Sequence, residues 1–248
     1  MSMMNIALTD ATAFVKKGLT VLRRKGFGYA FRYLFTYRVP LDSFWVAYYK
    51  TFKQHTFKFQ GKEYAYLYHA YNRTWDGERT VEVPIVWSAL QANREKRVLE
   101  VGNVLSHYFP ASHHIIDKYE VADGVVNIDV VDYRPDAPYD LIVSISTLEH
   151  VGWDERVKDP SKIRRAIENL RNHLAPEGEI LLTIPFGYNP HLDELVKAGW
   201  LEFNKCAYMK RVSLDNKWVE ASWEEVEGST YDEPYPHANA ILVGVIRK

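Results

Sequence analysis

The stretch RVLEVGNVLSHYF, residues 97–109, determines how the rest of the chain is interpreted. A short apolar run leads into Gly102, which is typical of the first strand and turn of a nucleotide-binding α/β domain. A glycine-rich loop would continue with further glycines, but NVLS, residues 103–106, follows instead. The turn keeps one glycine, and the question is whether it still holds a nucleotide-like ligand.

Apolar segments of strand length alternate with helical or turn segments from this point on. They are RVLEV (97–101), HHIIDKY (113–119), VVNIDVVDY (125–133), YDLIVSIS (139–146), GEILLTIPF (178–186) and AILVGVIRK (240–248). Such alternation predicts a doubly wound α/β fold, with a mostly parallel sheet and helices on its faces.

The segment DPSKIRRAIENLRNHLAPEG, residues 159–178, predicts the clearest helix. Its end is predicted by the turn residues 176–178. Apolar residues recur along one face at helical spacing, namely Ile163, Ile167, Leu170 and Leu174.

Residues 1–80 depart from this pattern and predict an amino-terminal extension, a lid or substrate-binding part, ahead of a domain over 81–248. Residues 1–38 are basic and aromatic, which fits either a helix on an anionic membrane surface or a docked helix with a solvated basic face. The segment HTFKFQGKEYAYLYHAYN, residues 55–72, predicts a hairpin turning at Gln60-Gly61. A helix is predicted after Gly77, with Pro84 in its first turn.

Composition excludes several classes of protein. With 248 residues, a net charge of -1 and 47% hydrophobic residues, the chain is typical of a globular protein and gives no support for a nucleic-acid partner. Cys206 is the only cysteine, so neither an internal disulfide nor a thiolate metal cluster is expected. Asp10 interrupts any signal-peptide core, and we expect a cytoplasmic chain. The oligomeric state is not predicted.

Acidic and polar residues stand where the apolar segments end. In open α/β sheets, ligands bind beyond the carboxyl ends of the strands, so these residues are candidates for a site. The first segment ends in Glu100-Val101-Gly102, the second reaches Asp117, the third ends in Asp132-Tyr133, and the fourth runs into SISTLEH, residues 144–150.

In this order and spacing the chain resembles the class I S-adenosylmethionine-dependent methyltransferases over about residues 80–248. The most specific part is YDLIVSISTLEHVG (139–152), followed by a helix and LRNHLAPEGEILLTIPF (170–186). The resemblance implies a Rossmann-like, seven-stranded sheet and S-adenosyl-L-methionine as cofactor. The family usually keeps two or three alternating glycines in the first turn, whereas Val104 and Ser106 stand at two of those positions here.

The resemblance also implies roles for individual residues. At the methionine end, Gly102 and Asn103 would lie against the cofactor, and Glu100 would order the turn around the methionine ammonium. Ser146 would line the methyl end, and Arg73 would pair with the methionine carboxylate. At the nucleoside end, Asp117 would accept hydrogen bonds from both ribose hydroxyls, and Asp132 would accept one from the adenine amino group, with Tyr133 against the ring. A carboxylate suits a diol or an amino group, and a glycine permits close backbone approach. The alternative is that Asp117 and Asp132 are ordinary acids that cap their own loops.

His150 is the first candidate for a catalytic base, with Glu149 beside it to raise its basicity. The alternative is that both residues only hold a turn. Trp75, His191 and His237 are candidates for acceptor binding, with Tyr71 as another wall of the pocket and Trp75 equally suited to anchor a core. No tight metal-ligand spacing appears, so no metal is expected.

The sequence thus predicts transfer of a methyl group to oxygen or nitrogen of a small molecule or glycan. A sugar is favoured because aromatic-rich segments such as YAYLYHAYNRTW, residues 64–75, suit stacking on carbohydrate faces. The alternative is a non-catalytic binding or scaffold protein on the same fold. A nicotinamide-dependent enzyme would need G-x-G-x-x-G, which the turn lacks.

Overall fold

The computed structural model describes residues 42–248, and a compact unit spans Trp45–Lys248. The basic segment 1–38, with its predicted membrane contact, lies outside the described residues. The compact unit already includes residues 45–80, so their action as a lid or substrate-binding part remains a prediction.

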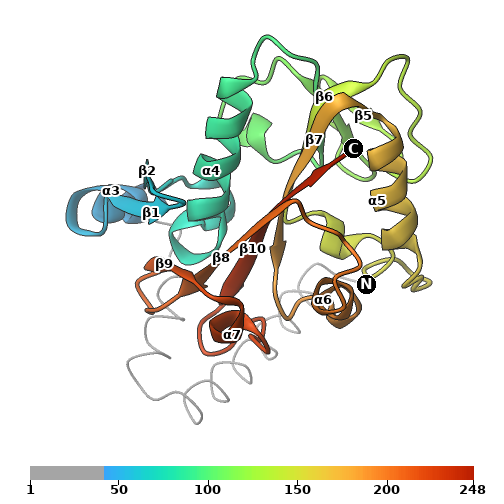
Figure 1. Ribbon diagram of the computed structural model, residues 1–248. Helices are drawn as coiled ribbons and strands as arrows, with labels where there is room; N and C mark the ends of the chain where they lie inside the picture. The colour runs from blue at the N-terminus through green and yellow to red at the C-terminus, as the bar shows by residue number, and fades with distance from the viewer. Residues whose placement is uncertain (1–41) are drawn as a thin grey trace, which may run out of the picture. The chain divides into compact units, whose positions relative to one another are not determined.

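An eight-stranded sheet forms the centre of this unit (Figure 1). Its order is β5-β4-β3-β6-β7-β10-β8-β9. The strands are β3 (Val98–Val101), β4 (His114–Asp117), β5 (Val125–Asn127), β6 (Tyr139–Ile145), β7 (Leu174–Pro185), β8 (Lys205–Arg211), β9 (Trp218–Ala221) and β10 (Ala240–Arg247). The five strands β5-β4-β3-β6-β7 pair in parallel in that order. β10 pairs antiparallel with both β7 and β8, and β8 pairs antiparallel with β9.

The predicted Rossmann-like, mostly parallel α/β fold is confirmed, and the predicted strand number of seven is wrong. The additional strand is β9, which lies at the edge beside β8. β8 and β9 both contain charged and exposed side chains, so they lack the continuous apolar runs that mark the central strands.

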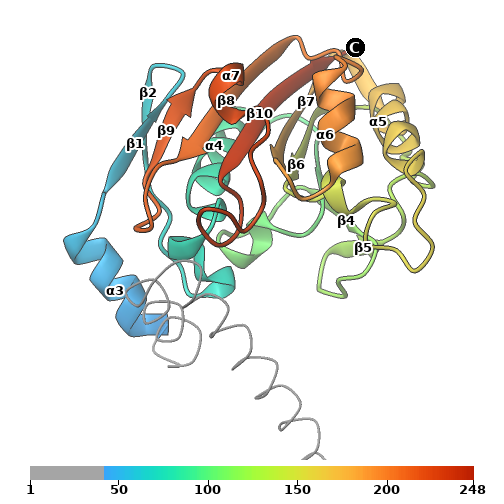
Figure 2. The same cartoon turned by 90° about the horizontal axis from the view of Figure 1, so that it is seen from below.

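Successive side chains of the central strands face two separate cores. Leu99, Ile142 and Leu182 pack with helices α5 (Lys162–Asn172) and α6 (Pro190–Lys197). The alternate residues Val98 and Val143 pack on the other face with α4 (Arg79–Ala92) and a hairpin of β1 (Thr56–Phe59) and β2 (Lys62–Ala65). Helices therefore cover both faces of the sheet, as Figure 2 shows.

The hairpin is confirmed at the predicted turn. Gln60 and Gly61 have φ angles of 49° and 72°, the left-handed backbone that a two-residue hairpin turn requires. The remaining helices are α3 (Asp42–Phe52) and α7 (Trp223–Val226), with short 3-10 helices η1 (Tyr71–Asp76), η2 (Leu105–His107) and η3 (Leu148–His150). Among residues 42–248, none of the helices combines the length and the apolar character that crossing a bilayer requires.

Two predicted helix details are wrong. Pro84 lies in the sixth position of α4 rather than its first turn, and its missing N–H leaves the carbonyl of Thr80 without a helical partner. That carbonyl instead accepts a hydrogen bond from the Leu67 amide at 3.0 Å. The proline is therefore tolerated because a residue outside the helix satisfies the freed oxygen.

The second correction concerns Leu174, which begins β7 because α5 ends at Asn172. Tyr139 pairs with Leu174 while Leu141 pairs with Glu179, so the chain between them is a bulge in the register of β6 and β7. The turn residues 176–178 therefore mark this irregularity within the strand and not the end of the helix.

Arg211 connects distant parts of the unit and is almost completely buried. Its guanidinium donates to the carbonyls of Asp76 (2.9 Å), Pro236 (2.7 Å), Leu214 (3.1 Å) and Ser213 (3.2 Å). It thereby joins the end of η1 to β8 and to the loop before β10.

We predict that Arg211→Ala lowers the free energy of unfolding by about 3–5 kcal/mol, because several buried acceptors lose their donor at once. Chemical denaturation measures this loss. Lys205→Ala, at an exposed position of the same strand, should change stability by less than about 0.5 kcal/mol. Equal effects of the two substitutions would contradict the assigned role of Arg211.

Candidate functional site

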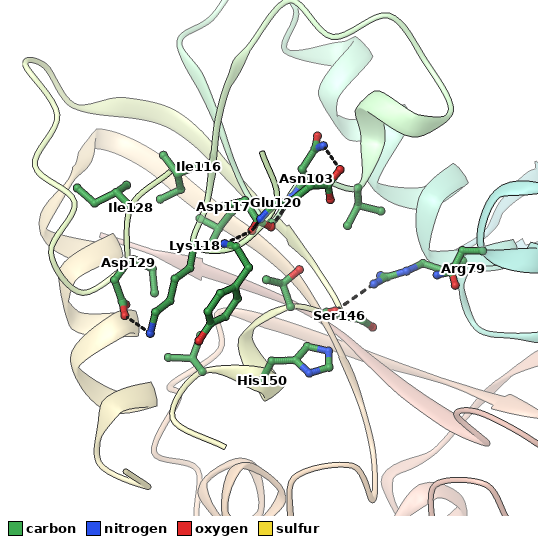
Figure 3. Close-up of a pocket in the computed structure, with 18 of the residues that line it drawn as sticks. Arg79, Asn103, Ile116, Asp117, Lys118, Glu120, Ile128, Asp129, Ser146 and His150 are labelled. Atoms are coloured by element: carbon green, nitrogen blue, oxygen red, sulfur yellow. Dashed lines mark hydrogen bonds and ion pairs between the residues drawn. The ribbon is translucent and has the colours of Figure 1, made fainter. Parts of the chain in front are cut away.

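A cavity of about 300 Å³ lies where the carboxyl ends of β3, β4, β5 and β6 meet (Figure 3). Gly102 follows β3, Asp117 ends β4, Asp129 follows β5 and Ser146 follows β6. The chain runs from β3 outward through β4 and β5, and then returns to the other side of β3 as β6. The cavity therefore occupies the point where the strand order reverses, the usual ligand position in this architecture.

Glu100 holds the turn that opens the cavity. Its side chain is completely buried, and Oε1 accepts hydrogen bonds from the amides of Val104 (2.9 Å) and Leu105 (2.8 Å). Oε2 lies 2.6 Å from Nε2 of His113. Glu100 does not line the cavity, and it orders the turn from behind through these hydrogen bonds. Its predicted position around the methionine ammonium remains a prediction.

Position 102 must be a glycine because the side chain of Thr147 packs against it. Its φ is +89°, a conformation that favours glycine, and a Cβ built there would lie 2.3 Å from Thr147 Oγ1. Both residues line the cavity. The single retained glycine thus lets the β3 turn and the β6 turn meet at the cavity wall.

Hydrogen-bond acceptors gather beyond β4. Asp117 Oδ1 accepts from the amides of Tyr119 and Glu120, both at 2.7 Å, and Oδ2 accepts from the Asn103 amide at 3.2 Å. Glu120 Oε1 accepts from Asn103 Nδ2 at 2.8 Å. Asp117, Asn103 and Glu120 all line the cavity, and Asp117 also caps its own loop.

Asp129 faces the cavity within a network of four charges. Lys118 Nζ lies 2.8 Å from both Asp129 Oδ2 and Glu155 Oε1, and Lys162 bridges the same two carboxylates. Burial raises the pKa of Asp129, but the hydrogen bonds from Lys118 and Lys162 outweigh it and lower the pKa below its usual value. The network keeps Asp129 ionised at neutral pH.

Asp132 and Tyr133 do not line the cavity, contrary to the prediction. β5 ends at Asn127, so Asp129 is the first acid beyond it. The Asp132 amide donates to the carbonyl of Asp129 in the following turn. The Tyr133 hydroxyl lies 2.6 Å from that of Tyr139, and its ring packs on the α5 core. The apolar run had suggested a longer strand.

The arginine at the cavity is Arg79 and not the expected Arg73. It lines the cavity from the start of α4 and donates to the carbonyls of Ile145 (2.7 Å) and Ser146 (3.0 Å) and to Glu82 Oε2 (3.1 Å). A guanidinium has five N–H donors, so two remain without a partner among the described residues. Arg73 lies in η1 and does not line the cavity.

Ser146 stands at the cavity end of β6 with a φ of +37°. Its amide donates to Thr183 Oγ1 at 3.0 Å and its hydroxyl donates to Glu82 Oε1. These two bonds and the Arg79 contact hold its backbone at the cavity wall in a strained conformation, which is frequent at functional sites.

His150 lines the same end of the cavity. Its Nδ1 lies 2.5 Å from Asp154 Oδ2, which also accepts from the Tyr188 hydroxyl at 2.6 Å. Its Nε2 lies 3.6 Å from Oε1 of Glu149, which is buried. Burial raises the pKa of Glu149 well above its usual value.

The three residues expected at the acceptor lie elsewhere. Trp75 is 1% exposed and packs in the α4 core beside Tyr49, so it is a core anchor. His191 lies in the first turn of α6, and His237 lies in the loop before β10. None of the three lines the cavity.

Sequence reasoning missed Arg79, Tyr108, Lys118, Glu120 and Asp129, all of which line the cavity. A signal existed for Arg79, because Arg79 and Glu82 form a charged i,i+3 pair on the buried side of an apolar helix. Tyr71, predicted from the sequence as another wall of the pocket, does line the cavity. Within residues 42–248, no three His, Cys, Asp or Glu side chains come together in a manner that would hold a metal ion.

Comparisons with known proteins give solved structures only. No family model matches the chain, and no curated protein matches it. The 1,6-didemethyltoxoflavin-N1-methyltransferase of Burkholderia thailandensis is 14% identical, with a TM-score of 0.43 over 79% of this chain and 99% of that chain. The N-methyltransferase NodS of Bradyrhizobium japonicum is 14% identical, with a TM-score of 0.40 over 69% and 91%.

A third structure, the sugar N-methyltransferase KedS8 of a Streptoalloteichus species, is 13% identical, with a TM-score of 0.35 over 69% of this chain and 89% of that chain. All three are described as methyltransferases. At these identities and scores none of their activities transfers to this chain.

We predict that Gly102→Ala lowers the free energy of unfolding by about 2 kcal/mol or more, because left-handed strain adds to the overlap with Thr147. Gly124→Ala is the matched control, since Gly124 has a φ of +79° and nothing within 4 Å of its built Cβ. It should cost about 1 kcal/mol by chemical denaturation. Equal losses would contradict the close approach to Thr147.

Proposed function

We propose that this chain is an S-adenosylmethionine-dependent methyltransferase acting on oxygen or nitrogen of a small molecule or glycan. The observation that carries the proposal is the division of polar groups along the cavity. Carboxylates from Asp117, Glu120 and Asp129 gather at one end, and the two available donors of Arg79 stand at the other. Adenosylmethionine carries its ribose hydroxyls and its adenine amino group at one end and its methionine carboxylate at the other.

Each part of the cofactor has a fitting group. Asp117 and Glu120 would accept from the ribose hydroxyls, and Asp129 in place of Asp132 would accept from the adenine amino group. Ile116 and Val130 offer apolar contact to the adenine faces. Arg79 would pair with the methionine carboxylate through its remaining N–H groups.

The turn after β3 disfavours a dinucleotide. Binding of a pyrophosphate needs free backbone amides at such a turn. Here the amides of Val104 and Leu105 already donate to Glu100. A ligand without phosphate does not need them, so the replacement of the later glycines is compatible with adenosylmethionine.

The bound sulfonium would supply an activated methyl group, and the protein would align the acceptor with it and exclude water. His150 would accept a proton when the acceptor must lose one. Asp154 and Tyr188 support this role by orienting its ring through Nδ1. Tyr71 and Tyr108 on the cavity wall are the aromatic surfaces available to a sugar or another flat acceptor.

We predict that calorimetric titration detects binding of adenosylmethionine and adenosylhomocysteine, and that Asp117→Ala weakens both by about tenfold or more through loss of a charged acceptor. Asp123→Ala, at an exposed loop position nearby, is the control and should bind as the unmodified chain does. Absence of binding at millimolar ligand would instead favour the non-catalytic scaffold.

A second titration separates the two candidate adenine acceptors. We predict that Asp129→Asn weakens adenosylhomocysteine binding by about fivefold or more, because an ionised acceptor at the cavity is lost. Asp132→Asn should leave the affinity unchanged, since Asp132 does not line the cavity. The reverse pattern would place the adenine outside the pocket described above.

A further inference from the structure

Three buried carboxylates surround one guanidinium beside the His150 end of the cavity. Glu78, Glu82 and Glu149 are 8%, 0% and 2% exposed, and we call them the acid cluster. The charges of Arg79, Glu82 and Glu78 all act on Glu149. Burial raises the pKa of Glu82 and of Glu149, because one guanidinium does not compensate three buried carboxylates. A second positive charge beside the cluster would favour the ionised carboxylates.

Two buried polar atoms at this end of the cavity have no hydrogen-bond partner among the described residues. They are Oε2 of Glu149 and the hydroxyl oxygen of Tyr108. By contrast, Glu78 accepts from the Ala238 amide, and both oxygens of Glu82 have partners. Tyr108 lines the cavity, whereas Glu149 does not line it itself and lies buried in the turn between the lining residues Thr147 and His150.

Two further aromatic rings continue from His150, outside the lining of the cavity. The Tyr188 ring lies 4.7 Å from the His150 ring and 5.1 Å from the Tyr231 ring, measured between centroids. Burial raises the pKa of Tyr231, and the negative charges of Glu78, Asp232 and Glu149 raise it further. Carboxylates together with aromatic faces attract an organic cation, whereas a neutral hydroxyl compound brings no charge to balance them.

We infer that the acceptor is an amine, which enters as an ammonium ion and pairs with Glu149 at the His150 end of the cavity. The inference rests on the proposed function and selects nitrogen as the methylated atom. The cluster would bind the ammonium because it lacks a second positive charge, and Tyr108 would offer its hydroxyl oxygen as an additional acceptor.

For an ammonium acceptor, Glu149 would take the proton in place of His150. The nitrogen gives one proton to Oε2 of Glu149 and regains its lone pair. A bond then forms between this nitrogen and the methyl carbon while the sulfur–methyl bond breaks, and the electron pair of that bond stays on sulfur. Burial suits Glu149 to this task because it raises the pKa of the carboxyl group.

Calorimetry with two probes tests the inference. Adenosylhomocysteine is neutral at sulfur, whereas sinefungin carries an amino group where the transferred methyl would stand. We predict that the unmodified chain binds sinefungin about tenfold or more tightly than adenosylhomocysteine, because the added ammonium pairs with Glu149. Glu149→Gln should abolish this preference and leave adenosylhomocysteine affinity unchanged. Glu177→Gln, at an exposed position of β7, is the matched control.

The outcomes separate the two levels of the argument. No binding of either probe would overturn the proposed function itself. Equal binding of both probes, or a preference that persists in Glu149→Gln, would overturn the amine inference while the methyltransferase proposal stands. If Glu149→Gln weakens adenosylmethionine binding as much as it weakens sinefungin binding, the cluster pairs with the sulfonium. That result would also overturn the amine inference. Glu78→Gln removes charge from another side of the cluster and gives the same reading if Glu149→Gln does not fold.

Discussion

The carboxylate of Glu100 is the interaction on which the architecture of the cavity depends. It is buried near the end of β3, and one of its oxygens accepts hydrogen bonds from the amides of Val104 and Leu105. Glycines normally let such a turn close tightly, and here a charged acceptor does so through two hydrogen bonds. The opening stretch therefore keeps a closed turn with a different chemistry, and the amides that a phosphate would need are already used.

Once this turn is closed, the topology of the sheet brings the other groups together. The reversal of strand order between β3 and β6 places the turns after both strands side by side, and Gly102 allows Thr147 to approach. Arg79 then fastens α4 to the end of β6 through the carbonyls of Ile145 and Ser146. One arginine thus links the helix that covers the sheet to the wall of the cavity.

The charges around the cavity differ in how they are balanced. At the Asp129 end, two lysines neutralise two carboxylates within a partly buried network. At the His150 end, three buried carboxylates share the guanidinium of Arg79. This asymmetry, together with the two unpartnered oxygens, points to a cationic group at the second end and motivates the choice of an amine acceptor.

The sequence by itself determined the alternation of strands and helices, the hairpin turn at Gln60-Gly61, and the contribution of Gly102, Asn103, Asp117, Ser146 and His150 to one cavity wall. These follow from local patterns, since strand ends in a parallel sheet meet at one edge. That Asp129 and Arg79 line the cavity, whereas Asp132 and Arg73 do not, follows only from the tertiary structure. The length of β5 and the approach of α4 depend on packing between segments far apart in the chain, which no local pattern contains.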